Sequence, residues 1–153
     1  MQHHTPVLLE EVLHFLNPQS GCTYIDATVG AGGHAEAILD RTRPDGRLLA
    51  LDQDEDALAL AAERLSEHQS RTVFRHANFS RIVDVANEEG FVNVDGIVAD
   101  LGVSSMMLDQ PERGFSFQSD GPLDMRMDRS GGTTASDIVN RMKEKELANT
   151  IYE

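Results

Sequence analysis

The sequence predicts an α/β fold with a parallel sheet, and two observations support that prediction. Over roughly the first 100 residues, short runs of aliphatic and β-branched residues alternate with segments whose apolar residues recur at helical spacing. Clusters of glycine, proline, asparagine and aspartate separate these runs. Because the chain has 153 residues, the length of one domain, we expect about four parallel strands with helices packed on the sheet.

Each expected element can be placed from its pattern. Helices are expected over residues 7–16, 34–41, 54–67 and 80–89, and strands over residues 23–27, 47–52, 72–76 and 95–100. Asn17–Pro18 ends the first helix, and Pro44–Asp45–Gly46 forms a turn before the second strand. Asp54 is suited to cap the third helix, since its carboxylate can accept hydrogen bonds from free amide groups of the first turn.

The pattern changes after residue 100. Residues 101–133 show no sustained periodicity, and a long irregular segment within a compact domain is more often functional than idle. A helical pattern resumes at about Ala135 and is unfinished at residue 153. We therefore expect two parts: residues 1–133, which belong to the α/β domain, and residues 134–153, which begin an incomplete helical region.

Charge and composition exclude several classes of protein. The chain has 13 basic and 26 acidic residues and a formal net charge of −13, which does not suit a protein that coats DNA or RNA. The acidic excess is smallest over residues 111–153, where a polyanion would meet the least repulsion. The chain lacks an apolar run that could span a bilayer, lacks a secretory signal, and has one cysteine, Cys22. These features predict a cytoplasmic protein with no membrane attachment, and no cysteine–histidine spacing predicts a metal site.

A glycine-rich turn after the first strand predicts a cofactor site. Asp26 ends that strand, and Gly30, Gly32 and Gly33 precede the next helix. Glycine lets the backbone approach a ligand closely, and a helix N-terminus offers unpaired N–H groups. The G-x-G-x-x-G fingerprint of dinucleotide sites is absent, since Ala35 stands where the third glycine would be. A nucleotide-dependent oxidoreductase is therefore the weaker alternative.

Two further acids and one aromatic residue fall at the ends of the other strands. Asp52 ends the second strand about 20 residues beyond the glycine turn, where a carboxylate can bind both ribose hydroxyls of an adenosine. Phe79 follows the third strand, where it suits an adenine ring, although a phenylalanine entering a helix is often part of the core. Asp100 ends the fourth strand. Open α/β sheets bind ligands at the carboxyl ends of their strands, so a purely structural domain does not account for these acids.

Five motifs also occur in a fixed order: HTPVLLEE (residues 4–11), DATVGAGGH (26–34), DLGVSS (100–105), RGFSF (113–117) and DGPLDMRMD (120–128). Together they resemble the bacterial 16S rRNA cytosine-N4 methyltransferases of the RsmH or MraW type, over essentially the whole chain. The resemblance implies a Rossmann-like S-adenosylmethionine-dependent methyltransferase fold. It implies S-adenosyl-L-methionine as the methyl donor and a cytidine of 16S rRNA in the small ribosomal subunit as the acceptor.

The resemblance also implies roles for individual residues. The residues that match the family's donor-binding positions are Gly32, Gly33, His34, Asp52, Phe79 and Asp100. The family's glutamine after the fourth strand has no match, because Met107 stands there and cannot make the hydrogen bonds of an amide. Family members are roughly twice as long, so the fold is expected to be incomplete. A non-catalytic fragment that binds the donor is the alternative to an active enzyme.

Methylation of cytosine N4 requires hydrogen-bond acceptors for the amino group, whose lone pair is delocalised into the ring. Asp100 is the best-placed acceptor, although its Asp-Leu-Gly context differs from the Asp/Asn-Pro-Pro-aromatic motif of familiar amino-methyltransferases, so it can instead serve the donor. For a base presented outside its stack, Phe115 and Phe117 are candidate platforms, with Arg113 and Arg126 for phosphate. The alternative for this segment is a lid whose phenylalanines pack inside.

Overall fold

The computed structural model describes residues 6–152, and the chain divides into two compact units. The first unit ends at Leu101 and the second begins at Gly102. The division expected from the sequence, between residues 133 and 134, marks where the helical pattern resumes, whereas the segment before it groups with the second unit. A helical insertion that starts at residue 134 stays a prediction.

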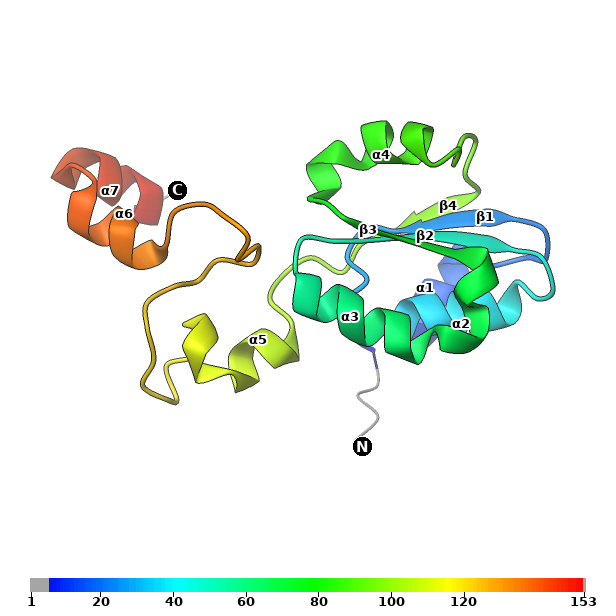
Figure 1. The fold of residues 1–153 in the computed structure, drawn as a ribbon, viewed down its shortest axis with the longest axis horizontal. Helices are drawn as coiled ribbons and strands as arrows, with labels where there is room; N and C mark the ends of the chain where they lie inside the picture. The colour runs from blue at the N-terminus through cyan, green and yellow to red at the C-terminus, as the bar shows by residue number, and fades with distance from the viewer. Residues whose placement is uncertain (1–5, 153) are drawn as a thin grey trace. The chain divides into compact units, whose positions relative to one another are not determined.

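Four parallel strands form the sheet of the first unit, in the order β3-β2-β1-β4 (Figure 1). Their bounds are β1 (Thr23–Asp26), β2 (Arg47–Asp52), β3 (Thr72–His76) and β4 (Gly96–Val98). Ile25 of β1 lies opposite Leu49 of β2 on one side and opposite Ile97 of β4 on the other. The order of the strands therefore reverses at β1, which makes the β1–β4 junction the switch point where open α/β sheets bind ligands.

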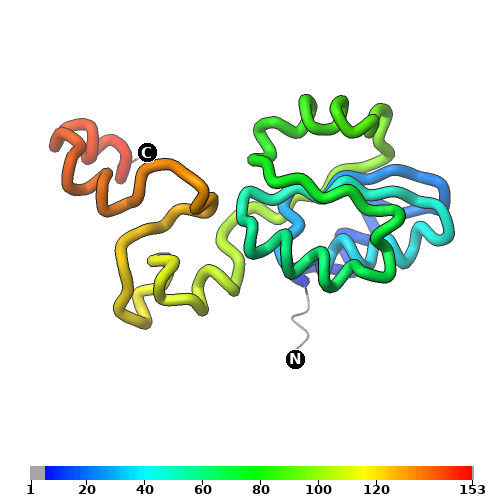
Figure 2. The backbone as a smooth tube through the Cα atoms, in the orientation of Figure 1, coloured from blue at the N-terminus to red at the C-terminus, as the bar shows by residue number. Residues whose placement is uncertain are grey.

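Helices cover both faces of this sheet, as Figures 1 and 2 show. On one face lie α1 (Leu9–Leu16), α2 (Gly33–Arg41) and α3 (Glu55–Arg64), and on the other lies α4 (Ile82–Glu88). Two 3-10 helices, η1 (Ser66–Arg71) and η2 (Phe79–Arg81), flank β3. The arrangement confirms the predicted α/β fold with a parallel sheet.

The core consists of two apolar clusters, one on each face of the sheet. Successive residues of a strand point to opposite faces, so each central strand contributes to both clusters. Tyr24 and Leu48 pack with residues of α1, α2 and α3, whereas Ile25 and Leu49 pack with residues of α4. All four are almost completely buried. Burial on both faces explains why the strands appear in the sequence as continuous apolar runs rather than as alternating patterns.

Several boundaries differ from the sequence expectation, most of them by one or two residues. The first helix begins at Leu9 rather than at residue 7, because Leu8 has a left-handed backbone with φ of 52°. The third helix ends at Arg64, before a 3-10 turn. The fourth strand covers only residues 96–98, and Asp100 donates its backbone N–H to the hydroxyl of Thr28 instead of to a neighbouring strand.

Short helices joined by loops make up the second unit. They are α5 (Ser105–Asp109), the 3-10 helix η3 (Pro111–Arg113), α6 (Ala135–Arg141) and α7 (Glu144–Tyr152). Residues 101–133, expected to be irregular, thus include a helix, capped where the Ser104 side chain accepts the N–H of Met107. The helical pattern from Ala135 is interrupted, since Met142 is extended and separates α6 from α7. No helix within residues 6–152 combines the length and the apolar character that crossing a membrane requires.

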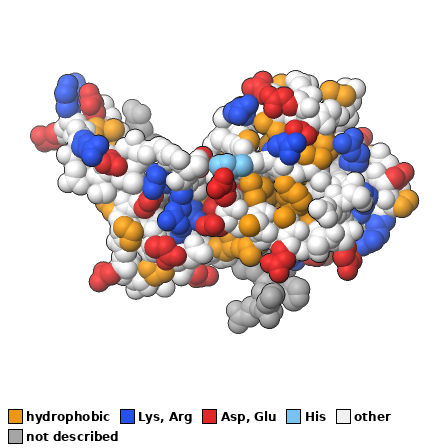
Figure 3. Space-filling view, viewed as in Figure 1, with side chains coloured by type: hydrophobic (Ala, Val, Ile, Leu, Met, Phe, Trp, Pro, Cys, Tyr) orange, Lys and Arg blue, Asp and Glu red, His pale blue; other side chains and the backbone are white. Residues whose placement is uncertain are grey.

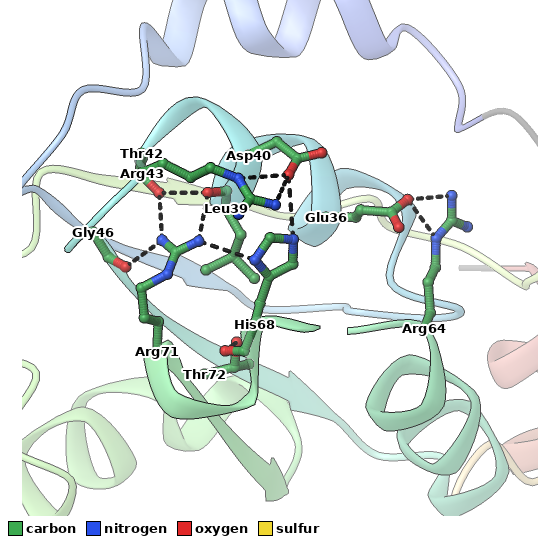
Figure 4. A network of polar contacts seen from close by, with 10 residues as sticks. All are labelled: Glu36, Leu39, Asp40, Thr42, Arg43, Gly46, Arg64, His68, Arg71 and Thr72. Atoms are coloured by element: carbon green, nitrogen blue, oxygen red, sulfur yellow. Dashed lines mark hydrogen bonds and ion pairs between the residues drawn. The ribbon is translucent and has the colours of Figure 1, made fainter. Parts of the chain in front are cut away.

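A polar network joins the end of α2 to η1 (Figure 4). Arg71 donates to the carbonyl oxygens of Gly46 and Leu39, each at 2.8 Å. Its Nη2 also lies 3.0 Å from Nδ1 of the buried His68, and because a guanidinium cannot accept, Nδ1 is the acceptor and carries no proton. The other ring nitrogen, Nε2, lies 3.3 Å from Oδ1 of Asp40. The network satisfies the carbonyl of Leu39 in the last turn of α2 and the carbonyl of Gly46 in the turn before β2.

Replacing Arg71 by methionine should lower the free energy of unfolding more than the same replacement of the exposed Arg43, which pairs with Asp40. Arg71→Met leaves the carbonyl of Gly46 without its donor and the carbonyl of Leu39 with only the 3.3 Å bond from the Thr42 hydroxyl, at a cost of roughly 2–4 kcal/mol, whereas an exposed ion pair contributes about 0–1 kcal/mol. Urea unfolding followed by circular dichroism measures both variants. Equal losses in the two variants would contradict this role of Arg71.

Candidate functional site

Three acidic side chains gather at the switch point of the sheet. Asp26 is the last residue of β1, Asp52 is the last residue of β2, and Asp100 follows the end of β4 by two residues. The loop of residues 27–32 leaves β1 beside them and leads into α2. Since parallel strands present their carboxyl ends at one edge, these residues share a site although 74 positions separate the first from the last.

Asp26 has the most unusual environment of the three. It is 2% exposed, its Oδ1 accepts the backbone N–H of Thr28 at 3.1 Å, and its Oδ2 has no hydrogen-bond partner within residues 6–152. Its pKa is raised to about 7, chiefly by burial and also by the negative charges of Asp52 and Asp100, although the bond from Thr28 acts in the opposite direction. A buried oxygen of this kind marks a place that a proton, a donor or a cation can fill.

Asp52 fixes the shape of the glycine loop. Its Oδ2 accepts the backbone N–H of Gly30 at 2.9 Å, and its Oδ1 accepts the backbone N–H of Asp54 at 3.0 Å. The carboxylate therefore ties the end of β2 to the loop that follows β1. Each oxygen of an ionised carboxylate has two lone pairs, so Asp52, which is only half-buried, can accept further hydrogen bonds from a ligand.

Thr28 connects the other two acids, and sequence reasoning did not single it out. Its backbone N–H donates to Asp26, and its hydroxyl accepts the backbone N–H of Asp100 at 2.7 Å. The pattern that could have indicated Thr28 is an Asx-turn, in which an aspartate side chain accepts the backbone N–H of the residue two positions later. Asp100 itself is exposed, so its carboxylate is accessible at the rim of the site.

The glycines of the loop are required by different neighbours. Gly32 has φ of +83°, and a Cβ there would lie 3.3 Å from Cα of Ala61 in α3. A Cβ on Gly33 would lie 2.3 Å from Cγ of Pro6. Both predicted donor-binding glycines are thus explained by contacts within the chain. Gly30, with φ of +52°, is the glycine with open space beside it, since the nearest atom to a Cβ there is 4.0 Å away.

The two other residues predicted to bind the donor differ in accessibility. His34 is 9% exposed, and its Nε2 lies 3.0 Å from the carbonyl oxygen of Val7. Phe79 is 43% exposed at the start of η2, a turn capped by Asn78, whose side chain accepts the N–H of Ser80. An exposed ring next to the carboxyl end of β3 can stack on a flat ligand, whereas the His34 ring already has a partner within the chain.

In the second unit, the two arginines predicted to bind phosphate are engaged within the chain. Arg113 is 1% exposed and donates to the carbonyl oxygens of Arg126 and Met127. Arg126 forms two 2.8 Å bonds to the carboxylate of Asp124, which lower the pKa of Asp124 to about 2. Both guanidinium groups thus shape the loop. Of the two predicted aromatic platforms, Phe115 is half-buried and Phe117 is fully exposed.

The acidic site favours a ligand with positive charge and hydroxyl groups. Ionised carboxylates accept hydrogen bonds and donate none, so a cluster of acids attracts a cation and repels a pyrophosphate. This chemistry argues against the oxidoreductase alternative. Asp26 and Asp52 together fit a ligand that carries a cationic group and a ribose diol.

Known proteins with similar sequences are methyltransferases about twice as long. A family model described as the MraW methylase family matches residues 1–153. The protein called ribosomal RNA small subunit methyltransferase H is 50% identical in Symbiobacterium thermophilum and 51% identical in Geobacter sp., over 151 residues in each case. Each match covers 99% of this chain and 48% of the relative, so the chain spans about half the length of the curated relatives it matches.

Solved structures of methyltransferases share the fold. An O-methyltransferase from Thermotoga maritima, described as SAM-dependent, has a TM-score of 0.53 and 21% identity over 66% of this chain and 38% of that chain. A protein-L-isoaspartate O-methyltransferase has a TM-score of 0.51 and 14% identity over 64% of this chain and 30% of that chain. These likenesses confirm an incomplete Rossmann-like methyltransferase fold. Since the family model matches the chain from end to end, this chain belongs to the MraW methylase family.

Proposed function

We propose that this chain forms the donor-binding part of an enzyme that uses S-adenosyl-L-methionine to methylate N4 of a cytidine in 16S rRNA of the small ribosomal subunit. The observation that carries the proposal is the buried Oδ2 of Asp26, which has no partner in the described part of the chain and is flanked by two carboxylates. A cationic ligand compensates that charge. Family membership and the names of the relatives support the reaction class and, with it, a cytoplasmic location beside the ribosome.

The proposed donor site uses the acids and the loop in separate roles. Asp52 accepts from the ribose hydroxyls while it keeps its bonds to the backbone of Gly30 and Asp54. Phe79 stacks on adenine through its exposed ring. Asp26 faces a positive charge of the donor, and Gly30 leaves room for the ligand beside the loop. When bound, S-adenosyl-L-methionine supplies an electrophilic methyl group on a positively charged sulfur.

The proposed acceptor residue is Asp100. Its carboxylate is exposed, and its backbone is held to the donor loop through Thr28. An acceptor at this position can take hydrogen bonds from the amino hydrogens of cytosine, which draws the N4 lone pair out of conjugation and orients it toward the methyl group. Methyl transfer from bound S-adenosyl-L-methionine would form the N4–C bond as the S–C bond breaks and would leave S-adenosylhomocysteine, and the proton lost by the amino group would pass to the solvent.

Within the second unit, we propose the fully exposed Phe117 as a platform on which a base of the RNA substrate stacks, with Phe115 as a partly buried support. Arg113 and Arg126, whose guanidinium groups bind backbone carbonyls and Asp124, are proposed to shape this loop rather than to hold phosphate. On the face shown in Figure 3, basic side chains lie among acidic ones rather than on one continuous surface. Binding to RNA through shape and base contacts suits such a surface better than binding through charge alone.

A second candidate is a fragment that binds the donor without turnover, and the half-length match to the relatives favours it. Methyl transfer from labelled S-adenosyl-L-methionine to unmodified small subunits separates the two, measured for this chain and for a full-length relative. Donor binding without transfer by this chain identifies the fragment.

In the full-length relative, the change that matches Asp100→Ala should lower kcat by about 100-fold or more, and a near-normal rate would contradict the role of Asp100.

Asp52→Ala should weaken binding of S-adenosylhomocysteine by roughly 10-fold to 100-fold, because it removes the ribose acceptor and the bond that holds Gly30. The matched control is Asp45→Ala, which removes an exposed acid before the amino end of β2. Titration calorimetry gives both dissociation constants. If the two variants bind equally well, the ribose contact assigned to Asp52 is wrong.

Asp26→Asn should stabilise the chain in a pH-dependent way. The folded pKa of about 7 lies above the ordinary value near 3.9, so the favourable contribution of the protonated carboxyl is complete below about pH 4 and is lost as the pH rises through 7. Asparagine stays neutral, so its advantage should grow between about pH 4 and pH 7, level off above that, and reach the order of 4 kcal/mol. Thermal unfolding of the wild type and Asp26→Asn at pH 4.5, 6 and 8 measures the difference in stability between the two proteins.

The same carboxyl links donor binding to proton release. A cation beside Asp26 favours the ionised form, so binding near pH 6.5 should release protons from the wild type and fewer from Asp26→Asn. Calorimetry in two buffers with different enthalpies of ionisation measures the number of protons. Equal release by both proteins would place the cation of the donor away from Asp26.

A further inference from the structure

The segment Pro6–Leu8, termed the N-terminal strap, lies against the start of α2, where the glycine loop of the proposed donor site ends. Pro6 occupies the space where a side chain of Gly33 would stand. The carbonyl oxygen of Val7 lies 3.0 Å from Nε2 of His34. Leu8 then turns the chain into α1 with a left-handed backbone, and its carbonyl accepts the N–H of Val12 at 2.9 Å. The strap thus touches the first two residues of α2.

The strap is held by its backbone and by Pro6 rather than by buried side chains. Val7 is 61% exposed and Leu8 is 63% exposed, although both are apolar. Leu8 also adopts a conformation that residues other than glycine rarely take. With little side-chain burial and a strained turn, the strap depends on the contact at Gly33 and on the bond to His34.

The bond to His34 fixes the state of its ring. A carbonyl oxygen only accepts, so Nε2 of His34 must carry the proton and donate it to Val7. The ring is nearly buried, and its Nε2 proton is therefore committed to the strap. The resemblance assigns His34 to the binding of S-adenosyl-L-methionine, whereas in the structure its ring N–H is directed at the carbonyl oxygen of Val7.

We propose that His34 is a positioning residue that latches the N-terminal strap against the start of α2, directly after the glycine loop, and that its effect on donor affinity acts through the strap. This inference rests on the proposed function, because the loop is taken to be the donor loop. The latched strap packs Pro6 on Gly33 and so supports the start of α2, which directly follows the loop. Without the latch, the loop loses that support while Asp26 and Asp52 keep their own bonds.

Hydrogen exchange on the intact chain tests the latch directly. His34→Ala should raise the exchange rate of the amides at the start of α1, Val12 included, by about 10-fold or more, since the strap is released. His34→Gln should restore much of the protection, because a glutamine amide can donate to the Val7 carbonyl. His14→Ala, a change in α1 that leaves the latch intact, is the control. Unchanged exchange in His34→Ala would overturn the latch.

A double-variant comparison tests whether His34 acts through the strap. The dissociation constant of S-adenosylhomocysteine is measured for the wild type, His34→Ala, a variant lacking residues 1–7, and the combination. We expect His34→Ala to weaken binding at least 5-fold in the full chain and less than 2-fold once residues 1–7 are absent. Multiplicative losses would mean that His34 contacts the donor itself and would overturn the inference. Circular dichroism checks that each variant is folded.

The outcomes separate this inference from the proposed function. If the wild type does not bind S-adenosylhomocysteine at all, the donor site is wrong, yet the hydrogen-exchange comparison still decides whether His34 holds the strap. If the wild type binds and the losses multiply, the donor site stands and the action through the strap fails. If the shortened variant does not fold, hydrogen exchange is compared for the wild type, His34→Ala and His34→Gln, each with and without S-adenosylhomocysteine. Equal protection of the amides at the start of α1 in these three proteins contradicts the inference.

Discussion

An enclosed carboxyl group with an unpaired oxygen is costly for a folded chain, and Asp26 places one at the centre of the sheet edge. Two more carboxylates lie near it, so the local charge is compensated only by a proton or by an incoming cation. The surrounding contacts are arranged about this feature. Thr28 binds one oxygen, Asp52 positions the loop, and Asp100 lies at the rim. A site built in this way is selective by electrostatics before any contact with a base or a sugar is made.

Much of the fold and of the acidic site could be predicted from the sequence, because both follow from local patterns. Continuous apolar runs indicate strands that are buried on both faces, and an acid at the end of each run falls at the ligand-binding edge. Asp26 and Asp52 needed only that argument, and the structure places both at strand ends. Asp100 was predicted to end the fourth strand, but that strand is three residues long and the acid lies two residues beyond it.

The reasons for particular residues could not be predicted, because they depend on contacts between distant parts of the chain. The glycine at 33 is explained by Pro6, 27 positions earlier, and Gly32 is explained by the approach of α3. Arg113 looked like a surface cation in the sequence and is buried against carbonyl groups 13 and 14 positions later. A pattern gives the type of residue and its place along an element, whereas such neighbours are known only once the chain is folded.

Thr28 gives the two halves of the proposed reaction a common support. One of its groups holds the buried acid on the donor side, and the other holds the backbone of the acid on the acceptor side. The position of the buried carboxyl group and the backbone position of Asp100 are therefore tied to each other through a single residue.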